Sequence, residues 1–255
     1  MSDPCVRSTL EEEGSLLRLT LQRPKANILD RTMVEALREE IGQARRWAPV
    51  RSVLIHGEGK HFSFGASVEE HRPEEVNEML PEFHALFREL AECGKVLLAA
   101  VRGQCLGGGL ELAAFCQRVF AAPGAQLGQP EIRLGVFAPV ASLILPLRIG
   151  QARSDDLLLS GRVVSAEEAL RMGLVDAVVE DPIEAARAYH REHLMPRSAA
   201  ALRYATLAAR TGLRRALRDL DEVERLYLSD LMATHDAPEG IASFLEKRAP
   251  QWTHN

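Results

Sequence analysis

The chain has 255 residues, of which 46% are hydrophobic and 26% are charged, a composition that is ordinary for a globular enzyme. Its length is enough for one large core, or for a core with an appendage. The net charge of −5 argues against nucleic acid as the main partner. No apolar run approaches the length of a membrane span.

The first 180 residues alternate strand-like and helix-like segments. Asp30 is placed to cap the first helix, and the segment Ser165-Ala-Glu-Glu168 has the pattern of a capping box, with Gly173 at the other end of its helix. Pro81 lies inside the second helix, where we expect it to kink or split that helix. Strands are expected at residues 16–21, 51–56, 96–101, 118–122, 125–127 and 175–179. Helices are expected at residues 30–47, 73–92, 108–116, 138–149, 152–159 and 165–172.

From residue 183 onward the sequence is helical in character. Helices are expected at 183–193, 198–211, 213–234 and 237–248, with Gly212 as one of the residues that separate them. Because the alternation of strands and helices stops near residue 180, the sequence predicts an α/β core over residues 1–180. A second, helical module is predicted over residues 181–255.

The four cysteines, Cys5, Cys93, Cys105 and Cys116, have no CxxC spacing and no neighbouring histidine array. We therefore expect reduced thiols, without disulfides and without a metal site. The N-terminal segment MSDPCVRSTLEEEG is polar and acidic, unlike a signal or transit peptide. These features predict a cytoplasmic protein.

The segment LGGGLE at residues 106–111 places three consecutive glycines at the start of a predicted helix. Glycines are costly there, but they let a ligand approach the backbone, and free N–H groups at a helix start favour a negative oxygen. Glu111 lies in an otherwise apolar helix, where a buried carboxylate is expensive unless it is paired or useful. A structural alternative is that Glu111 only interacts favourably with the helix dipole.

Glu131 follows Pro130 in the segment GQPE, and by itself it is an ordinary loop carboxylate. Together with Glu111 it can supply a general base and a general acid. An oxyanion site beside two carboxylates indicates proton chemistry next to a carbonyl group.

Eight segments, in order, resemble the crotonase (enoyl-CoA hydratase/isomerase) superfamily over nearly the whole chain. They are RPKAN (23–27), GKHFSFGAS (59–67), VRGQCLGGGLELA (101–113), QLGQPEIRLG (126–135), LSG (159–161), SAEEA (165–169), GLV (173–175) and FLEKR (244–248). The resemblance implies an α/β fold, a crotonase-like spiral of strand-strand-helix repeats. It also implies that the C-terminal helical module serves trimerisation, with two trimers often stacked into a hexamer.

The resemblance further implies an acyl-CoA thioester as substrate, so coenzyme A arrives with the substrate and no separate cofactor is expected. Matched residue by residue, the backbone N–H groups that hold the thioester oxygen belong to Ala66 and Gly108. Hydratases of the family carry two glutamates, which match Glu111 as the main base and Glu131 as the main proton donor. Many other members lack one or both glutamates, so their joint presence favours addition or removal of water.

Two departures from straight-chain hydratases imply a different acyl shape. Phe64 stands in the oxyanion loop, which has no acid at position 67, and the usual glycine run after Glu131 is replaced by VFAPVAS at 136–142. His71 and His84 belong to a segment that often covers the acyl site in the family, although we expect a surface or helix-packing role for both. The residues expected to contact the acyl or coenzyme A moiety are Lys25, Ala26, Phe64, Ser67, Val68, Gly107, Phe137, Pro139 and Lys247.

The segments PKANILD (24–30) and FSFGASVEEH (62–71) resemble the cyclohexa-1,5-diene-1-carbonyl-CoA hydratases of anaerobic benzoyl-CoA degradation. Those enzymes form 6-hydroxycyclohex-1-ene-1-carbonyl-CoA. This resemblance implies a hydro-lyase that is a homotrimer or a dimer of trimers and binds neither nucleic acid nor a membrane. The alternatives are a general hydratase of straight or branched 2-enoyl-CoA, and a non-catalytic acyl-CoA- or RNA-binding relative. Both glutamates and the negative charge disfavour the non-catalytic alternative.

Overall fold

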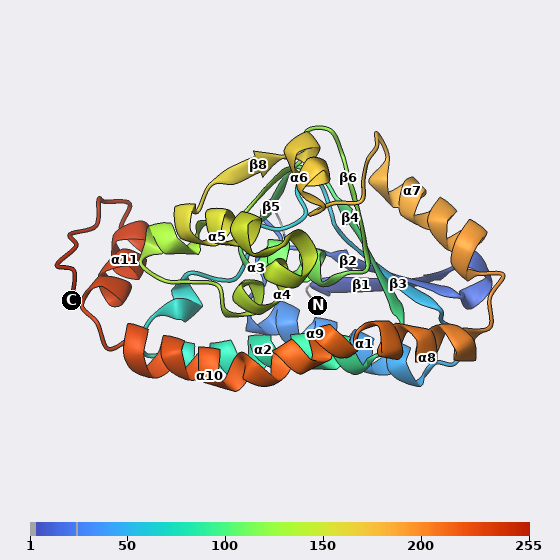
Figure 1. The fold of residues 1–255 in the computed structure, drawn as a ribbon, viewed down its shortest axis with the longest axis horizontal. Coiled ribbons are helices and arrows are strands. Elements are labelled where there is room, and N and C mark those ends of the chain that lie inside the picture. The colour runs from blue at the N-terminus through green and yellow to red at the C-terminus, as the bar shows by residue number, and fades with distance from the viewer. Residues whose placement is uncertain (1–3, 24) are drawn as a thin grey trace.

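The computed structural model describes residues 4–23 and 25–255 (Figure 1). Its larger sheet has six strands in the order β1-β2-β3-β4-β6-β9, with β1 antiparallel to β2 and every other pair parallel. The smaller sheet has the order β5-β7-β8. The strands are β1 (Val6–Glu11), β2 (Leu16–Leu21), β3 (Ser52–Gly57), β4 (Val96–Val101), β5 (Gln104–Leu106), β6 (Arg118–Ala121), β7 (Gln126–Gly128), β8 (Val163–Ser165) and β9 (Ala177–Val178).

Helices surround the two sheets and connect their strands. In Figure 1, α8, α9 and α10 run along one side of the molecule, where α10 packs against α2 and α4. The helices are α1 (Arg31–Arg46), α2 (Val76–Glu92), α3 (Gly108–Phe115), α4 (Pro139–Ile149), α5 (Gln151–Ser160), α6 (Ala166–Met172), α7 (Pro182–Tyr189), α8 (Ala199–Ala209), α9 (Thr211–Ala216), α10 (Leu220–Arg225) and α11 (Asp236–Leu245). No helix in the described part of the chain is long and apolar enough to cross a membrane.

Local sequence signals account for several of these boundaries. The Asp30 side chain accepts a hydrogen bond from the Met33 N–H and caps α1, as expected. Ser165 accepts from the Glu168 N–H at the start of α6, and Gly173 ends that helix in the left-handed conformation at φ +81°. Every residue of β4 is buried, which explains its continuous apolar sequence in the middle of a parallel sheet.

Other elements depart from the sequence-based expectations. The strands β1, β5 and β8 were not expected. Strands β5 and β8 have only three residues each and depend on pairing with β7. Strand β1 pairs with β2. Pro81 does not split α2, which is continuous from Val76 to Glu92. Gly212 does not separate two helices but is the second residue of α9.

The pairing of β5 with β7 determines where the glycine-rich turn lies. The two strands are parallel, and Leu106 at the end of β5 lies opposite Gly128 at the end of β7. The chain then continues the strand pairing by one bond, from the Gly107 N–H to the Gly128 carbonyl at 3.0 Å. Parallel pairing therefore brings the start of α3 beside the segment that carries Glu131.

Candidate active site

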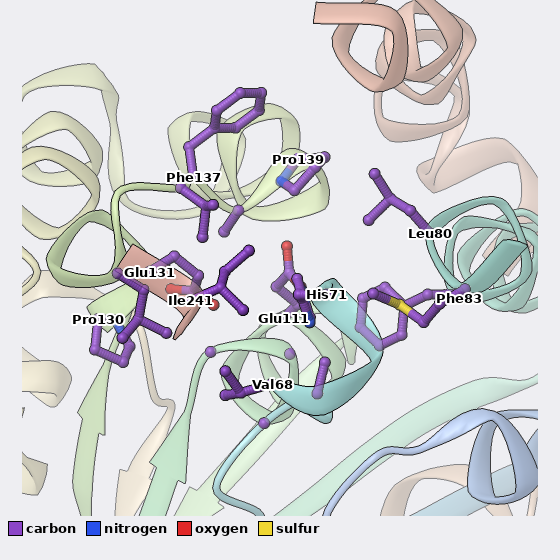
Figure 2. A pocket seen from close by; sticks show the side chains of 18 of the residues that line it. Val68, His71, Leu80, Phe83, Glu111, Pro130, Glu131, Phe137, Pro139 and Ile241 are labelled. Atoms are coloured by element: carbon purple, nitrogen blue, oxygen red, sulfur yellow. The ribbon is translucent and has the colours of Figure 1, made fainter. Parts of the chain in front are cut away.

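A largely apolar cavity lies at the ends of β5 and β7 and contains two carboxyl groups (Figure 2). In this view Glu111 lies between Glu131 on one side and Phe83 on the other. The lining residues are Phe64, Gly65, Ala66, Val68, His71, Met79, Leu80, Phe83, Gly107, Gly108, Glu111, Pro130, Glu131, Leu134, Val136, Phe137, Ala138, Pro139 and Ile241.

Gly107 is required by both its conformation and its surroundings. Its φ is +51°, in the region that favours glycine. A Cβ atom at this position would lie only 2.6 Å from Oε1 of Glu131. The absent side chain is therefore what lets the turn before α3 and the Glu131 carboxyl occupy the same corner of the cavity.

The N–H groups of Ala66 and Gly108 lie close together at the cavity wall. A Cβ atom on Gly108 would lie 3.1 Å from the Ala66 nitrogen, and one on Gly65 would lie 3.2 Å from the Gly108 nitrogen. The Ser63 hydroxyl holds the first loop by donating to the Asn27 carbonyl and accepting from the Gly65 N–H. Within residues 4–23 and 25–255, neither the Ala66 nor the Gly108 N–H donates a turn or loop hydrogen bond. Two such donors can stabilise an oxygen on which negative charge develops.

Glu111 is enclosed by protein and bound at the start of a second helix. All residues of α3 are buried, and Glu111 is only 3% exposed. Its Oε1 accepts a hydrogen bond of 2.7 Å from the Ala141 N–H in the first turn of α4. Burial raises the pKa of Glu111 to about 7, while backbone N–H groups of Ala141 and Val140 oppose the shift. The N-terminus of α4, rather than the N-terminus of its own helix α3, thus holds the Glu111 carboxylate.

Glu131 lies in the short 3₁₀ segment Pro130–Leu134 and has fewer hydrogen-bond partners than Glu111. Its Oε2 is buried and has no partner among the described residues. Burial, followed by the charge of Glu111, raises the pKa of Glu131 to about 8. Both pKa values are thus raised toward neutrality, and that of Glu131 is raised more, because Glu111 receives a backbone N–H from α4 and Glu131 also faces the charge of Glu111. Two carboxyl groups whose pKa values differ in this way can act as an acid and a base.

The structure brings together most of the residues that the sequence singled out. Glu111, Glu131, Ala66 and Gly108 all line one cavity, as do Phe64, Val68, Gly107, Phe137 and Pro139. Lys25, Ala26, Ser67 and Lys247 are not among its lining residues.

The residues outside the cavity have other surroundings. The Ala26 carbonyl accepts a hydrogen bond from the Phe64 N–H at 3.0 Å, and Ser67 is buried with its hydroxyl 3.3 Å from Glu69. Lys25 and Lys247 are exposed, and each has a positive φ. Their assignment to the coenzyme A moiety stays a prediction.

The expectation of a surface or packing role for His71 was wrong. Its ring lines the cavity, and Nδ1 donates a 2.7 Å hydrogen bond to the Ser67 carbonyl, so this nitrogen carries the proton. Burial lowers the pKa of His71, which keeps the ring neutral at neutral pH. His84 is a packing residue, as expected: its buried Nδ1 lies 2.5 Å from Glu224 and joins α2 to α10.

Sequence reasoning also missed most of the apolar wall. Helix α2 contributes Met79, Leu80 and Phe83, and α11 contributes Ile241. The periodicity of these helices marks an apolar face but does not say whether that face meets the core or a cavity.

Two N–H groups from separate segments, neither of which donates a turn or loop hydrogen bond within the described residues, lie next to an acid and a base and define an enzyme site for proton chemistry on a carbonyl compound. The chain belongs to the enoyl-CoA hydratase/isomerase family, whose profile matches residues 11–255. It is 53% identical to cyclohexa-1,5-dienecarbonyl-CoA hydratase of Thauera aromatica over 95% of each chain. It is 34% identical to a probable enoyl-CoA hydratase of Bacillus subtilis, over 92% of this chain and 93% of that one. A crystal structure of an enoyl-CoA hydratase/isomerase from Pseudoalteromonas atlantica matches with a TM-score of 0.84 and 27% identity, over 98% of this chain and 100% of that one.

The proximity of the Gly108 and Ala66 N–H groups predicts that Gly108→Ala will impair turnover. The backbone N–H stays, but the new methyl group would lie 2.9 Å from the Phe83 ring and 3.1 Å from the Ala66 nitrogen, so it would displace an oxygen bound between the two donors. This displacement should cost about as much as removal of one donor, about 10²–10³-fold in kcat. Gly124→Ala is the control, because a Cβ there meets nothing within 4 Å. Steady-state kinetics of both variants would refute the oxyanion assignment if Gly108→Ala kept the activity of Gly124→Ala.

Burial of the two carboxyl groups predicts a pH-dependent gain in stability when either is made neutral. For Glu131 the folded-state pKa of about 8 exceeds the ordinary value of 4.5, so its stabilising contribution is complete below about 4.5 and is lost as pH rises through 8. Thermal unfolding should therefore show Glu131→Gln near wild type at pH 5 and more stable at pH 8, by at least about 1 kcal/mol, or about 2–4 °C. Glu111→Gln should show the same sign. A difference in stability between variant and wild type that shrinks with rising pH would contradict the raised pKa values of the two carboxyl groups.

Proposed function

We propose that this protein adds water to cyclohexa-1,5-diene-1-carbonyl-CoA and forms 6-hydroxycyclohex-1-ene-1-carbonyl-CoA, in anaerobic benzoyl-CoA degradation. The observation that carries the proposal is the 53% identity to the Thauera aromatica hydratase over 95% of each chain. The paired carboxyl groups and the apolar cavity support the proposal, because hydration needs a base, an acid and an apolar space for the ring.

In this mechanism the thioester oxygen binds between the N–H groups of Ala66 and Gly108. Glu111 removes a proton from water, and the water oxygen forms a bond to C2, the β carbon of the ring double bond between C1 and C2. The π electrons of that double bond move toward the thioester oxygen, where the two N–H groups stabilise the charge of the dienolate. Glu131 then delivers a proton to C5, so the remaining ring double bond lies between C1 and C6. One water is added and one double bond is lost, and with the ring renumbered this is the 6-hydroxycyclohex-1-ene product.

The pKa values support this division of roles. Glu131, with the higher pKa of about 8, keeps a proton to donate at neutral pH. Glu111, at about 7, is held partly ionised by the Ala141 N–H and is the better base. A general acid and base with pKa values near the working pH are the most effective.

The cavity walls support a ring as the acyl group. Phe83 and Phe137 present flat apolar surfaces, and Phe137 is fixed by edge-to-face packing on Tyr227 at 5.2 Å. Pro139 replaces a mobile glycine with a rigid residue at the start of α4. Phe64 is 41% exposed and packs against His61, so it forms the rim of the cavity.

We propose that the helices after residue 180 assemble the chain into a trimer or a dimer of trimers. Exposed apolar side chains such as Leu226 and Phe244 in this part of the chain support an interface there. Lys25 and Lys247, at the surface, are proposed to meet the coenzyme A phosphates.

The assigned roles predict a bell-shaped pH dependence of kcat/KM, which reports the acid and base of the free enzyme. Activity should fall below about pH 7 as Glu111 gains a proton, and above about pH 8 as Glu131 loses one. The two limbs belong to the coupled pair rather than to single residues. The measurement is the initial rate from pH 5.5 to 9.5 with the substrate concentration well below KM. A rate that is constant from pH 6 to 9 would exclude these roles.

A substrate panel tests the function itself. The cyclic dienoyl thioester should have a higher kcat/KM than crotonyl-CoA, although an apolar wall discriminates by only about 1–3 kcal/mol per methylene-sized mismatch. Phe64→Ala should narrow the difference because it removes the apolar rim. If crotonyl-CoA is turned over as well as the cyclic diene, the protein is a general 2-enoyl-CoA hydratase instead.

A further inference from the structure

Tyr227 is a polar residue of the C-terminal helices that reaches the wall of the cavity. It lies in the π-helical stretch Leu226–Leu231, directly after α10, which packs on the two helices α2 and α4. Its ring packs edge-to-face on Phe137 at 5.2 Å and lies 6.5 Å from the ring of His71. Both of these neighbours line the cavity. Single π-helical turns occur frequently at functional sites.

The Tyr227 hydroxyl is completely buried, and it has no hydrogen-bond partner within residues 4–23 and 25–255. The side chain is 0% exposed, and its oxygen has no partner among the described residues. Buried polar groups in folded proteins are almost always paired, so an unpaired one calls for an explanation. Phenylalanine would supply the same packing against Phe137 without this cost, and therefore packing does not account for a tyrosine.

The surroundings of the hydroxyl identify what it can bind. Burial, followed by the charges of Glu131 and Glu111, raises the pKa of Tyr227, so the phenol stays a hydrogen-bond donor. Tyr227 is not itself among the residues that line the cavity, but its ring lies directly behind two of them, His71 and Phe137. Glu131 Oε2 is likewise buried and unpaired among the described residues. A donor behind this wall and an acceptor in the cavity thus both lack partners among the described residues, beside the space in which the proposed reaction moves one water molecule.

We propose that the Tyr227 hydroxyl donates a hydrogen bond to the oxygen that is added to the ring. That oxygen belongs to water before the addition and to the β-hydroxyl group of the product afterwards. The inference rests on the proposed function, which supplies this oxygen. Tyr227 then acts as a specificity-determining residue that recognises a hydroxylated ring, in addition to the two glutamates.

The test compares Tyr227→Phe with Tyr204→Phe, which makes the same chemical change on α8 at a side chain that is 69% exposed. The first readout is kcat/KM for the cyclic diene. The second is the dissociation constant of two thioesters in a Glu111→Gln background, which limits turnover. One is the hydroxylated product, and the other is cyclohexanecarbonyl-CoA, which lacks the hydroxyl group.

Tyr227→Phe should lower kcat/KM and weaken binding of the hydroxylated thioester, each by about tenfold, the usual effect of one lost hydrogen bond. Binding of cyclohexanecarbonyl-CoA should change by less than about twofold, which also shows that the variant is folded. Its thermal stability should equal or exceed that of wild type, because an unpaired buried hydroxyl is removed. Tyr204→Phe should match wild type in every readout.

Unchanged kinetics, or equal weakening of both thioesters, would overturn the inference and reduce Tyr227 to a packing residue. The proposed function has a separate failure, in which the wild-type protein does not hydrate the cyclic diene. A wild-type protein that does so, with an unaffected Tyr227→Phe variant, contradicts the role of Tyr227 alone.

Discussion

Two carboxyl groups inside one apolar cavity are the constraint on which the rest of the site depends. Each group is expensive to ionise there, and the protein offsets that cost unequally. Glu111 receives a backbone N–H from α4, whereas Glu131 has an oxygen without a partner in the described part of the chain and faces the charge of Glu111. The unequal hydrogen bonding separates the two pKa values, and this separation lets two residues of the same type perform opposite proton transfers.

The fold brings these groups together through short parallel strands. Because β5 and β7 run side by side, the glycine turn after one strand and the Pro130–Leu134 segment after the other emerge at the same edge. Gly107 continues the pairing with a hydrogen bond to Gly128, and its missing side chain leaves room for Glu131. The oxyanion donors and both carboxyl groups are thus placed by backbone pairing, and the helices contribute the apolar walls.

Features of the fold and of the site could be predicted from the sequence where neighbouring residues cause them. The caps at Asp30 and Ser165 and the buried strand β4 follow from neighbouring residues, and the sequence predicted them correctly. The glycine turn and Glu111 could be singled out from the residues alone, whereas Glu131 needed the family resemblance. The resemblance put His71 in a segment that often covers the acyl site but did not show that its ring lines the cavity, and Tyr227 could not be placed from sequence.

The reason for Tyr227 is distance along the chain, whereas His71 is placed locally by its hydrogen bond to the Ser67 carbonyl. His71 and Tyr227 are more than 150 residues apart, and only the packing of the C-terminal helices brings their rings within 6.5 Å. An apolar helix face has the same periodicity whether it covers a core or a cavity, so Leu80 and Ile241 gave no signal of their role either. The strands β5 and β8 depend in the same way on their partner β7.

The most direct test of the central claim is a carboxyl titration by ¹³C NMR of protein labelled at glutamate Cδ, with signals assigned from Glu111→Gln and Glu131→Gln. The account predicts two carboxyl signals that titrate near pH 7 and pH 8, the higher one belonging to Glu131. It also predicts that the Glu131 pKa falls in Glu111→Gln, because the neighbouring charge is gone. Two carboxyl groups that titrate independently near the ordinary value of 4.5 would contradict the account.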